Sequence, residues 1–226
     1  MSRPPDKRVE ALRSALVAFA VLAIAFMALS GIVAAGGLRS VDREVAATMS
    51  RIWVSPLLPL FQLIAVLGGI EVTSLVALAL AAYIWRKGFH AEAGAVLALP
   101  AAVLLEELYK HLVPQPGPGP ELAHPDGPSL STLIERAGNM GSYPSGHMTR
   151  TVFVYGLLAF VVVRMAERRW IRLAAVPAAV LLCALMAFDR IYLNVHWESD
   201  VIGGVLLGAL ALAAAILWLD RPRGVV

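Results

Sequence analysis

The sequence predicts an all-α, polytopic membrane protein in which six transmembrane helices form one bundle. The 226 residues are 59% hydrophobic and only 15% charged, and their mean hydropathy is +0.73. A soluble domain carries about 25% charged residues. Six stretches approach the roughly 20 apolar residues that cross a bilayer. Because no internal repeat or change in composition separates a second unit, we expect residues 1–226 to form one membrane domain.

The first two apolar stretches differ in length. The first predicted span is Ser14–Ala35, which follows a basic segment at residues 1–13. It is longer than the core of a signal peptide, which has about 7–15 residues, so we expect a retained helix. The second stretch, Pro56–Trp85, is too long for one straight span. A break is predicted at Leu67–Gly69, with Gly69–Trp85 crossing the membrane and the part before it tilted or interfacial.

The remaining stretches complete the predicted bundle. The third span, Glu92–Val113, contains Pro100, which is expected to interrupt it. Residues 114–143 are polar and rich in proline and glycine, so we expect a loop. Spans four to six are predicted at Met148–Val163, Leu173–Phe188 and Val201–Leu219.

The distribution of basic residues predicts the orientation. Cytoplasmic segments of membrane proteins carry an excess of lysine and arginine. With the N-terminus inside, twelve of the nineteen Lys and Arg residues fall on the inner side, and every inner segment contributes. We therefore expect a multi-pass cell-membrane protein with both termini in the cytoplasm. The 114–143 loop then faces the periplasm or the cell exterior.

Ionisable residues gather at the outer ends of four predicted spans. Charged groups at this depth are costly unless they pair or act, so we interpret the cluster as a functional site. The YPSGH sequence places Ser145 and Gly146 at a helix start, and the free N–H groups of a helix start bind phosphate well. Taken alone, this motif is equally typical of an ordinary helix cap. The cluster comprises Lys110, His147, Asp189, Arg190, His196 and Asp200.

A second pattern lies in the sequence DRIYLNVHWESD at residues 189–200. If span six begins near residue 195, His196 and Asp200 share one helix face. The carboxylate can then orient the imidazole and leave its other nitrogen as a nucleophile. Arg190 adds a planar, permanent cation suited to phosphate. A lysine near a span end usually snorkels to the interface, but beside these groups Lys110 is interpreted as part of a phosphate clamp.

Together these groups favour phosphoryl transfer through a phosphohistidine. His196 would attack phosphorus in line, His147 would protonate the leaving oxygen, and water would hydrolyse the intermediate. The single cysteine, Cys183, excludes a disulfide framework and a cysteine zinc site, and no metal or other cofactor is expected. A site at the outer boundary suits a lipid phosphate whose tail stays in the bilayer. The net charge of only +3 gives no indication of a nucleic-acid partner.

These residues resemble the type 2 phosphatidic acid phosphatase family, whose motifs are K-x6-R-P, P-S-G-H and S-R-x5-H-x3-D. The second motif is complete at residues 144–147, and the third departs only at Asp189, which replaces the serine. The resemblance implies a metal-independent phosphatase with a helical core. It also implies His196 as nucleophile, Asp200 as its orienting group, His147 as acid, and a phosphate clamp of Lys110, Ser145, Gly146 and Arg190.

The first motif departs further from the family pattern. Lys110 matches, but Gly117 occupies the arginine position, and Gln115 stands where many members have an additional arginine. The missing cation would weaken phosphate binding, change the preferred headgroup, or be replaced by another side chain. Arg150 and Arg136 are the candidate replacements. For Arg150, a role as an anchor for lipid headgroups is an equally good interpretation.

Three functions remain open on the sequence. The first is a phosphatase acting on a lipid phosphate or a polyprenyl (di)phosphate. The second is a phosphotransferase that passes the group to an alcohol acceptor. The third is a non-catalytic lipid-phosphate binding or transport protein, against which the His196–Asp200 pair argues. Oligomeric state is also open, because the small residues Gly204 and Gly208 suit packing within the chain as well as dimerisation.

Overall fold

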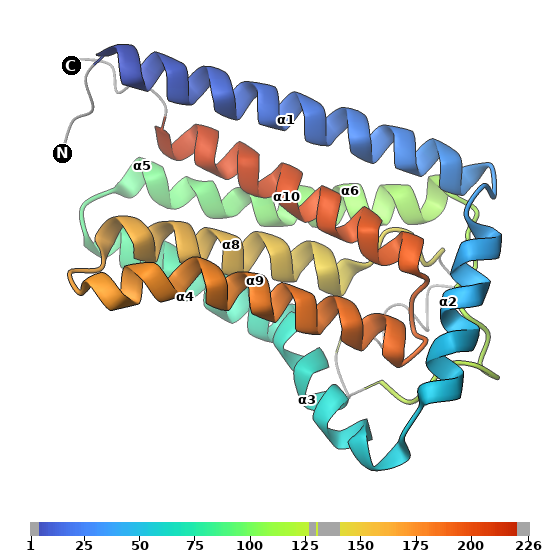
Figure 1. Ribbon diagram of the computed structural model, residues 1–226. Helices are drawn as coiled ribbons and strands as arrows, with labels where there is room; N and C mark the ends of the chain where they lie inside the picture. The colour runs from blue at the N-terminus through green and yellow to red at the C-terminus, as the bar shows by residue number, and fades with distance from the viewer. Residues whose placement is uncertain (1–4, 127–129, 131–140, 221–226) are drawn as a thin grey trace.

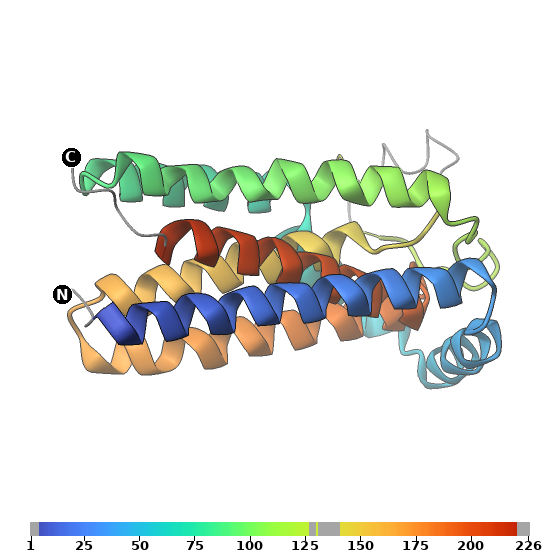
Figure 2. The ribbon, with the colours of Figure 1, turned by 90° about the horizontal axis from the view of Figure 1, so that it is seen from above.

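The computed structural model describes residues 5–126, 130 and 141–220, and all regular structure among these residues is helical. The predicted all-α class is therefore confirmed. The long helices lie side by side along a common direction (Figures 1 and 2). The start of α1 (Pro5–Ala34) and the end of α10 (Glu198–Asp220) lie at the same end of this bundle in both views.

The central helix of the bundle is α8 (Gly146–Met165), which packs against α9 (Arg169–Tyr192) and α10 on its two sides. Its apolar residues Phe153 and Leu157 are fully buried among side chains of the neighbouring helices. The outer faces of the bundle instead expose large aliphatic side chains. Examples are Leu75, Leu104 and Leu173, each more than 60% exposed. Such a surface suits lipid rather than water.

Within the described part of the chain, four helices are long and apolar enough to cross a membrane. They match predicted spans one, four, five and six, and they comprise Leu12–Ala34, Gly146–Met165, Arg169–Tyr192 and Glu198–Asp220. Helix α2 (Arg39–Ile52) and the segment Ser55–Gly68 would add a fifth span, bent by 97°, if they are counted as one. The helices at predicted spans two and three have only 17 and 15 residues. The count of six spans stays a prediction.

The predicted break in the second apolar stretch is confirmed. Helix α3 (Leu58–Gly68) ends immediately before Gly69, and α4 (Ile70–Arg86) begins immediately after it. Gly69 itself is extended, with φ −62° and ψ 154°. The short helical turn η1 (Ser55–Leu57) precedes α3. The chain therefore changes direction at the predicted place.

The predicted interruption of the third span at Pro100 was wrong. Pro100 lies in the first turn of α6 (Ala98–Leu112), where the missing N–H of proline would have had no helical partner. The irregularity comes earlier, because α6 is preceded by the short helices α5 (His90–Ala93) and η2 (Gly94–Leu97).

Helix α2, which lies across one end of the bundle (Figure 1), was not among the predicted elements. It is rich in charged residues and contacts both α9 and α10. Its Asp42 is buried, whereas Val41 on the same turn is exposed. The helix is amphipathic, and it closes the end of the bundle where α8 begins.

Two glycines bring the starts of α8 and α10 into contact. A Cβ atom on Gly204 would lie 2.4 Å from the carbonyl oxygen of Ser145, and one on Gly208 would lie 2.6 Å from that of Thr149. Neither distance is possible for a real side chain. Of the two interpretations left open for this small-residue pair, packing within the chain is the one that the structure shows.

Candidate active site

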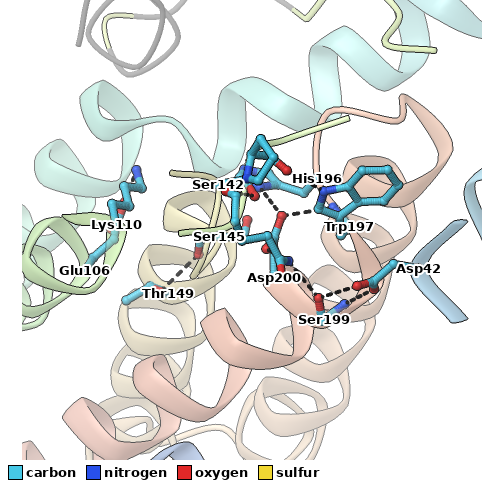
Figure 3. A network of polar contacts seen from close by, with 12 residues as sticks. Asp42, Glu106, Lys110, Ser142, Ser145, Thr149, His196, Trp197, Ser199 and Asp200 are labelled. Carbon is cyan, nitrogen blue, oxygen red and sulfur yellow. Dashed lines mark hydrogen bonds and ion pairs between the residues drawn. The ribbon is translucent and has the colours of Figure 1, made fainter. Parts of the chain in front are cut away.

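Four helix ends meet at the end of the bundle that α2 covers. These are the end of α6, the start of α8, the end of α9 and the start of α10 (Figures 1 and 3). The predicted site residues on these helix ends and in the turn before α10 are all buried. Arg136 lies outside the described residues. The buried set comprises Lys110, Ser145, Gly146, His147, Arg150, Arg190, His196 and Asp200.

The predicted pair of His196 and Asp200 is present, but not for the predicted reason. Helix α10 begins at Glu198 rather than near residue 195, so His196 lies in the turn before the helix. Asp200 is the third helical residue, and its Oδ2 lies 3.3 Å from Nδ1 of His196. The same oxygen accepts the backbone N–H of Trp197 at 3.0 Å. A carboxylate at this position commonly reaches back over a helix start in this way.

Asp200 is fixed from its other side by Gln115. The Gln115 Nε2 donates to Oδ1 of Asp200 at 2.7 Å and to the hydroxyl of Ser199 at 2.9 Å. Asp42 of α2 accepts the N–H and the hydroxyl of Ser199 at 2.9 and 2.8 Å (Figure 3). Both oxygens of Asp200 are thus engaged. An aspartate held in this way orients the imidazole through Nδ1 and leaves Nε2 for nucleophilic attack.

The start of α8 lies directly beside this pair. The backbone N–H of Ser145 donates to the carbonyl oxygen of Asp200 at 2.9 Å, which joins the second and third sequence motifs. Ser145 occupies the N-cap position, but its hydroxyl does not cap the helix. The first N–H groups of an α-helix have no intrahelical partner. They therefore remain available to an anion.

Several buried polar side-chain atoms around this helix start have no hydrogen-bond partner in the described part of the chain. They include Ser145 Oγ, His147 Nδ1 and Arg150 Nη2. Buried polar atoms are otherwise almost always hydrogen-bonded. Three such atoms beside a free helix start form a site that a multiply charged oxyanion could fill.

Cations surround His147. Lys110, Arg150 and Arg190 all lie close enough to the imidazole to interact with it electrostatically, as does His196. Among the described residues, no group of three His, Cys, Asp or Glu side chains has an arrangement that could hold a metal ion. The positive charges that act on His147 include those of lysine and arginine side chains.

The guanidinium of Arg190 is surrounded by carboxylates. Its Nη1 and Nη2 donate to Asp126 at 2.8 and 3.0 Å, and its Nε donates to Asp189 at 2.7 Å. Asp189 stands where the family pattern has serine. This departure places a buried carboxylate in direct contact with the Arg190 guanidinium. Asp126 comes from the loop before α8, and it was not among the predicted site residues.

Tyr143 anchors the segment that leads into α8. Its hydroxyl lies 3.0 Å from the hydroxyl of Ser30 in α1, and its ring covers Gly203 of α10 so closely that a Cβ there would lie 2.4 Å from the ring. Burial raises the pKa of Tyr143 to about 12, so the phenol stays protonated at physiological pH. These contacts fix the position of the backbone just before the Ser145–His147 turn.

Comparison with known proteins places these features in a family. The family model described as "PAP2 superfamily" matches residues 91–223. A decaprenylphosphoryl-5-phosphoribose phosphatase from Mycobacterium tuberculosis (strain ATCC 25618 / H37Rv) is 32% identical over 124 residues, which are 55% of this chain and 56% of that protein. Phosphatidylglycerophosphatase B from Bacillus subtilis (strain 168) is 34% identical over 88 residues, which are 37% of this chain and 40% of that protein. This chain therefore spans about half, or less, of the length of these relatives.

A solved structure has the same fold. It is the crystal structure of a transmembrane PAP2 type phosphatidylglycerolphosphate phosphatase from Bacillus subtilis. The TM-score is 0.77 at 20% identity, and the match covers 92% of this chain and 98% of that one. This likeness and the apolar helices identify a multi-pass membrane protein. The region matched by the family model contains all four helices whose ends form the site, and the chain belongs to the PAP2 superfamily.

Proposed function

We propose that this protein is a metal-independent phosphatase that hydrolyses a lipid phosphate or a polyprenyl (di)phosphate through a phosphohistidine. One observation carries the proposal. The His196–Asp200 pair lies against a helix start whose surrounding polar atoms, Ser145 Oγ and His147 Nδ1 among them, have no partner in the described part of the chain. An oriented nucleophile beside an unfilled oxyanion site suits phosphoryl transfer, in which positioning and charge stabilisation supply most of the catalysis.

The proposed reaction has two steps. Nε2 of His196 attacks phosphorus, the bond from phosphorus to the lipid oxygen breaks, and His147 gives its proton to that oxygen. Water then attacks the phosphohistidine, the N–P bond breaks, and inorganic phosphate leaves as His147 takes back a proton. Asp200 stabilises the imidazolium that forms on His196. Lys110, Arg190 and the start of α8 at Ser145 and Gly146 hold the phosphoryl oxygens.

The relatives support the substrate class. Their names refer to phosphatases of decaprenylphosphoryl-phosphoribose and of phosphatidylglycerophosphate, both phosphate esters with a large apolar part. We extend this substrate class to the present chain. We also propose a topology of six spans with both termini in the cytoplasm, so that the site faces the periplasm or cell exterior. In that arrangement the apolar tail of a substrate stays in the bilayer while its phosphate enters between the four helix ends.

A phosphate-release assay tests the proposal. Purified protein in detergent micelles is given a polyprenyl diphosphate, phosphatidylglycerophosphate and phosphatidic acid, each with and without an added alcohol. We expect release from at least one substrate without alcohol, no loss in EDTA, and no release by His196→Ala. Arg164→Gln is the control, because Arg164 pairs with Asp220 at the opposite end of α8.

The other outcomes point to the alternative functions. Turnover that needs the alcohol identifies a phosphotransferase with the same phosphohistidine. Tight binding of lipid phosphate with no turnover of any substrate identifies a binding or transport protein. Loss of activity in EDTA with recovery in Mg²⁺ or Zn²⁺ contradicts the metal-independent mechanism.

A further inference from the structure

We infer that Arg150, held in place by Glu106, is the phosphate-binding cation that Gly117 does not supply. The inference rests on the proposed function and adds a substrate-binding residue and a positioning residue to the site. Three observations support it: the position of the Arg150 guanidinium, its pairing with Glu106, and the space around Gly117.

The guanidinium of Arg150 folds back to the first turn of α8. A Cβ atom on Gly146 would lie 2.8 Å from its Nη1, so the charge lies beside the residue that precedes His147. Its Nε donates to the carbonyl oxygen of Gly68 at 3.2 Å. The side chain is only 4% exposed. Burial among these groups argues against a role as a surface anchor for lipid headgroups, the other interpretation of this residue.

Glu106 holds two cations at this place. Its carboxylate lies 2.8 Å from Nζ of Lys110 and 3.5 Å from Nη1 of Arg150, and the glutamate side chain is 1% exposed. Glu107 also lies 3.5 Å from Lys110 Nζ, but its side chain is 36% exposed, so Glu106 is the buried carboxylate that joins the two cations. Lys110 and Glu106 lie one turn apart on α6, and Arg150 comes from α8, so the three residues connect the two helices. Glu106 therefore fixes Lys110, the cation of the first motif, and Arg150 relative to each other.

Arg150 still has an unused donor. Its Nη2 is buried and has no hydrogen-bond partner among the described residues. A buried guanidinium with an unpaired N–H is costly, and phosphate oxygens are suitable acceptors for it. Ser145 Oγ, five residues earlier in the chain, has no partner among the described residues either. Both donors are therefore available to the same phosphate.

The surroundings of Gly117 allow a direct test. Among the described residues, a Cβ atom there would meet only the Cβ of Ser142, at 3.5 Å, which is an ordinary contact. Gly117 can therefore accept a Cβ atom without a clash among these residues. An arginine introduced at this position restores the family pattern of the first motif, and it should make Arg150 dispensable.

The experiment compares Arg150→Gln, Arg150→Lys and Arg150→Gln/Gly117→Arg with the wild-type protein. Loss of one charged hydrogen bond to phosphate is expected to raise KM about 10- to 100-fold. Inhibition by inorganic phosphate should weaken by the same factor, and kcat should change less. The KM of Arg150→Lys should lie between those of the wild-type protein and Arg150→Gln. Adding Gly117→Arg to Arg150→Gln should bring KM most of the way back to the wild-type value. Arg164→Gln, which removes an arginine of α8 outside the site, should leave KM unchanged.

Glu106 is tested as a positioning residue. Glu106→Asp shortens the carboxylate arm and should raise KM by withdrawing Arg150 and Lys110 together. Gly117→Arg should partly rescue this variant, because the new arginine does not depend on Glu106. A purely structural role for Glu106 would give no such rescue.

Unchanged KM and unchanged phosphate inhibition in Arg150→Gln would overturn the inference. A rise in KM in Arg150→Gln that Gly117→Arg does not reduce would also overturn the inference. If Arg150→Gln does not fold, Arg150→Lys decides, because a wild-type KM there shows that guanidinium geometry is not used. If the wild-type protein releases no phosphate from any substrate, the proposed function fails. The inference is then judged by calorimetric binding of inorganic phosphate to wild type and Arg150→Lys, with equal affinities contradicting it.

Discussion

Arg190 forms a two-point ion pair with Asp126. The Nη1–Oδ2 and Nη2–Oδ1 distances are 2.8 and 3.0 Å, the parallel arrangement in which arginine also binds phosphate. Asp189 accepts from Nε at 2.7 Å, so every nitrogen of this guanidinium contacts a carboxylate. If Arg190 holds the substrate phosphate as proposed, the phosphate must displace Asp126 first.

Asp126→Asn should therefore tighten phosphate binding. The amide keeps one acceptor for Arg190 but loses the negative charge that competes with the phosphate. We expect KM and the inhibition constant for inorganic phosphate to fall about three- to tenfold, since a charge pair at such a distance contributes substantially to binding. Glu121→Gln, which removes an exposed carboxylate from the same loop, should change neither constant. A higher KM in Asp126→Asn would show that the aspartate supports the site instead of competing with substrate.

The contrast between Asp126 and His196 shows which parts of the site are predictable from the sequence. His196, Asp200 and Arg190 stand at fixed spacing within twelve residues, and local spacing of this kind can be recognised in the sequence itself. Asp126 lies 64 residues from Arg190 in a loop of unremarkable polar composition. Only the folded chain brings the two together, so no local pattern could have indicated the pair.

Gly204 shows how closely the site depends on helix packing. A Cβ at this position would lie 2.4 Å from the Ser145 carbonyl oxygen, a backbone atom that cannot move away alone. Gly204→Ala should push the starts of α8 and α10 apart, reduce stability by about 1–3 kcal/mol, and lower kcat. Thermal unfolding in detergent and phosphate release measure the two effects. Gly31→Ala is the control, because no described atom outside the neighbouring backbone of its own helix lies within 4 Å of a Cβ there.

Helix α2 explains why part of the fold escaped prediction. Apolar length and composition identify spanning helices, and they located the apolar spans of α1, α8, α9 and α10 to within four residues at each end. Residues 39–52 are too polar for that criterion, although the helix supplies Asp42 to the start of α10. The His196–Asp200 pair was inferred on the condition that a helix begins near residue 195, whereas α10 begins at Glu198. Asp200 reaches back to His196 from inside the helix, a contact that a continuous helix would also have permitted.

The side of the membrane that the site faces is tested by cysteine labelling. In a Cys183→Ala background, Glu121→Cys lies on the loop near the site and Lys87→Cys follows α4, and both positions are exposed. An impermeant thiol reagent applied to intact cells should label position 121 and not position 87, because most lysine and arginine residues fall on the side of Lys87. Labelling of position 87 alone would reverse the topology.

Asp200→Asn should reduce turnover far more than it reduces stability. The carboxylate accepts from Gln115 Nε2 and from the N–H of Trp197 while it orients His196, and an amide can replace only part of this. By analogy with the orienting aspartate of a catalytic triad, we expect a loss of about 10²–10⁴-fold in kcat. Thermal unfolding measured beside kcat separates the two effects. An equal loss of activity and folded protein would indicate that Asp200 only caps α10.

The last prediction assigns the two histidines. His196→Ala should abolish both turnover and the trapped phosphoenzyme, because His196 is the imidazole that Asp200 orients among the described residues. His147→Ala should remove most turnover. It should still allow slow phosphoenzyme formation from a substrate with a good leaving group, since such a group needs little protonation. Mass spectrometry that locates the acid-labile phosphate on the protein shows which of the two histidines is the nucleophile. Phosphate on His147 with none on His196 would reverse the roles, and full activity in His196→Ala would exclude the phosphohistidine mechanism.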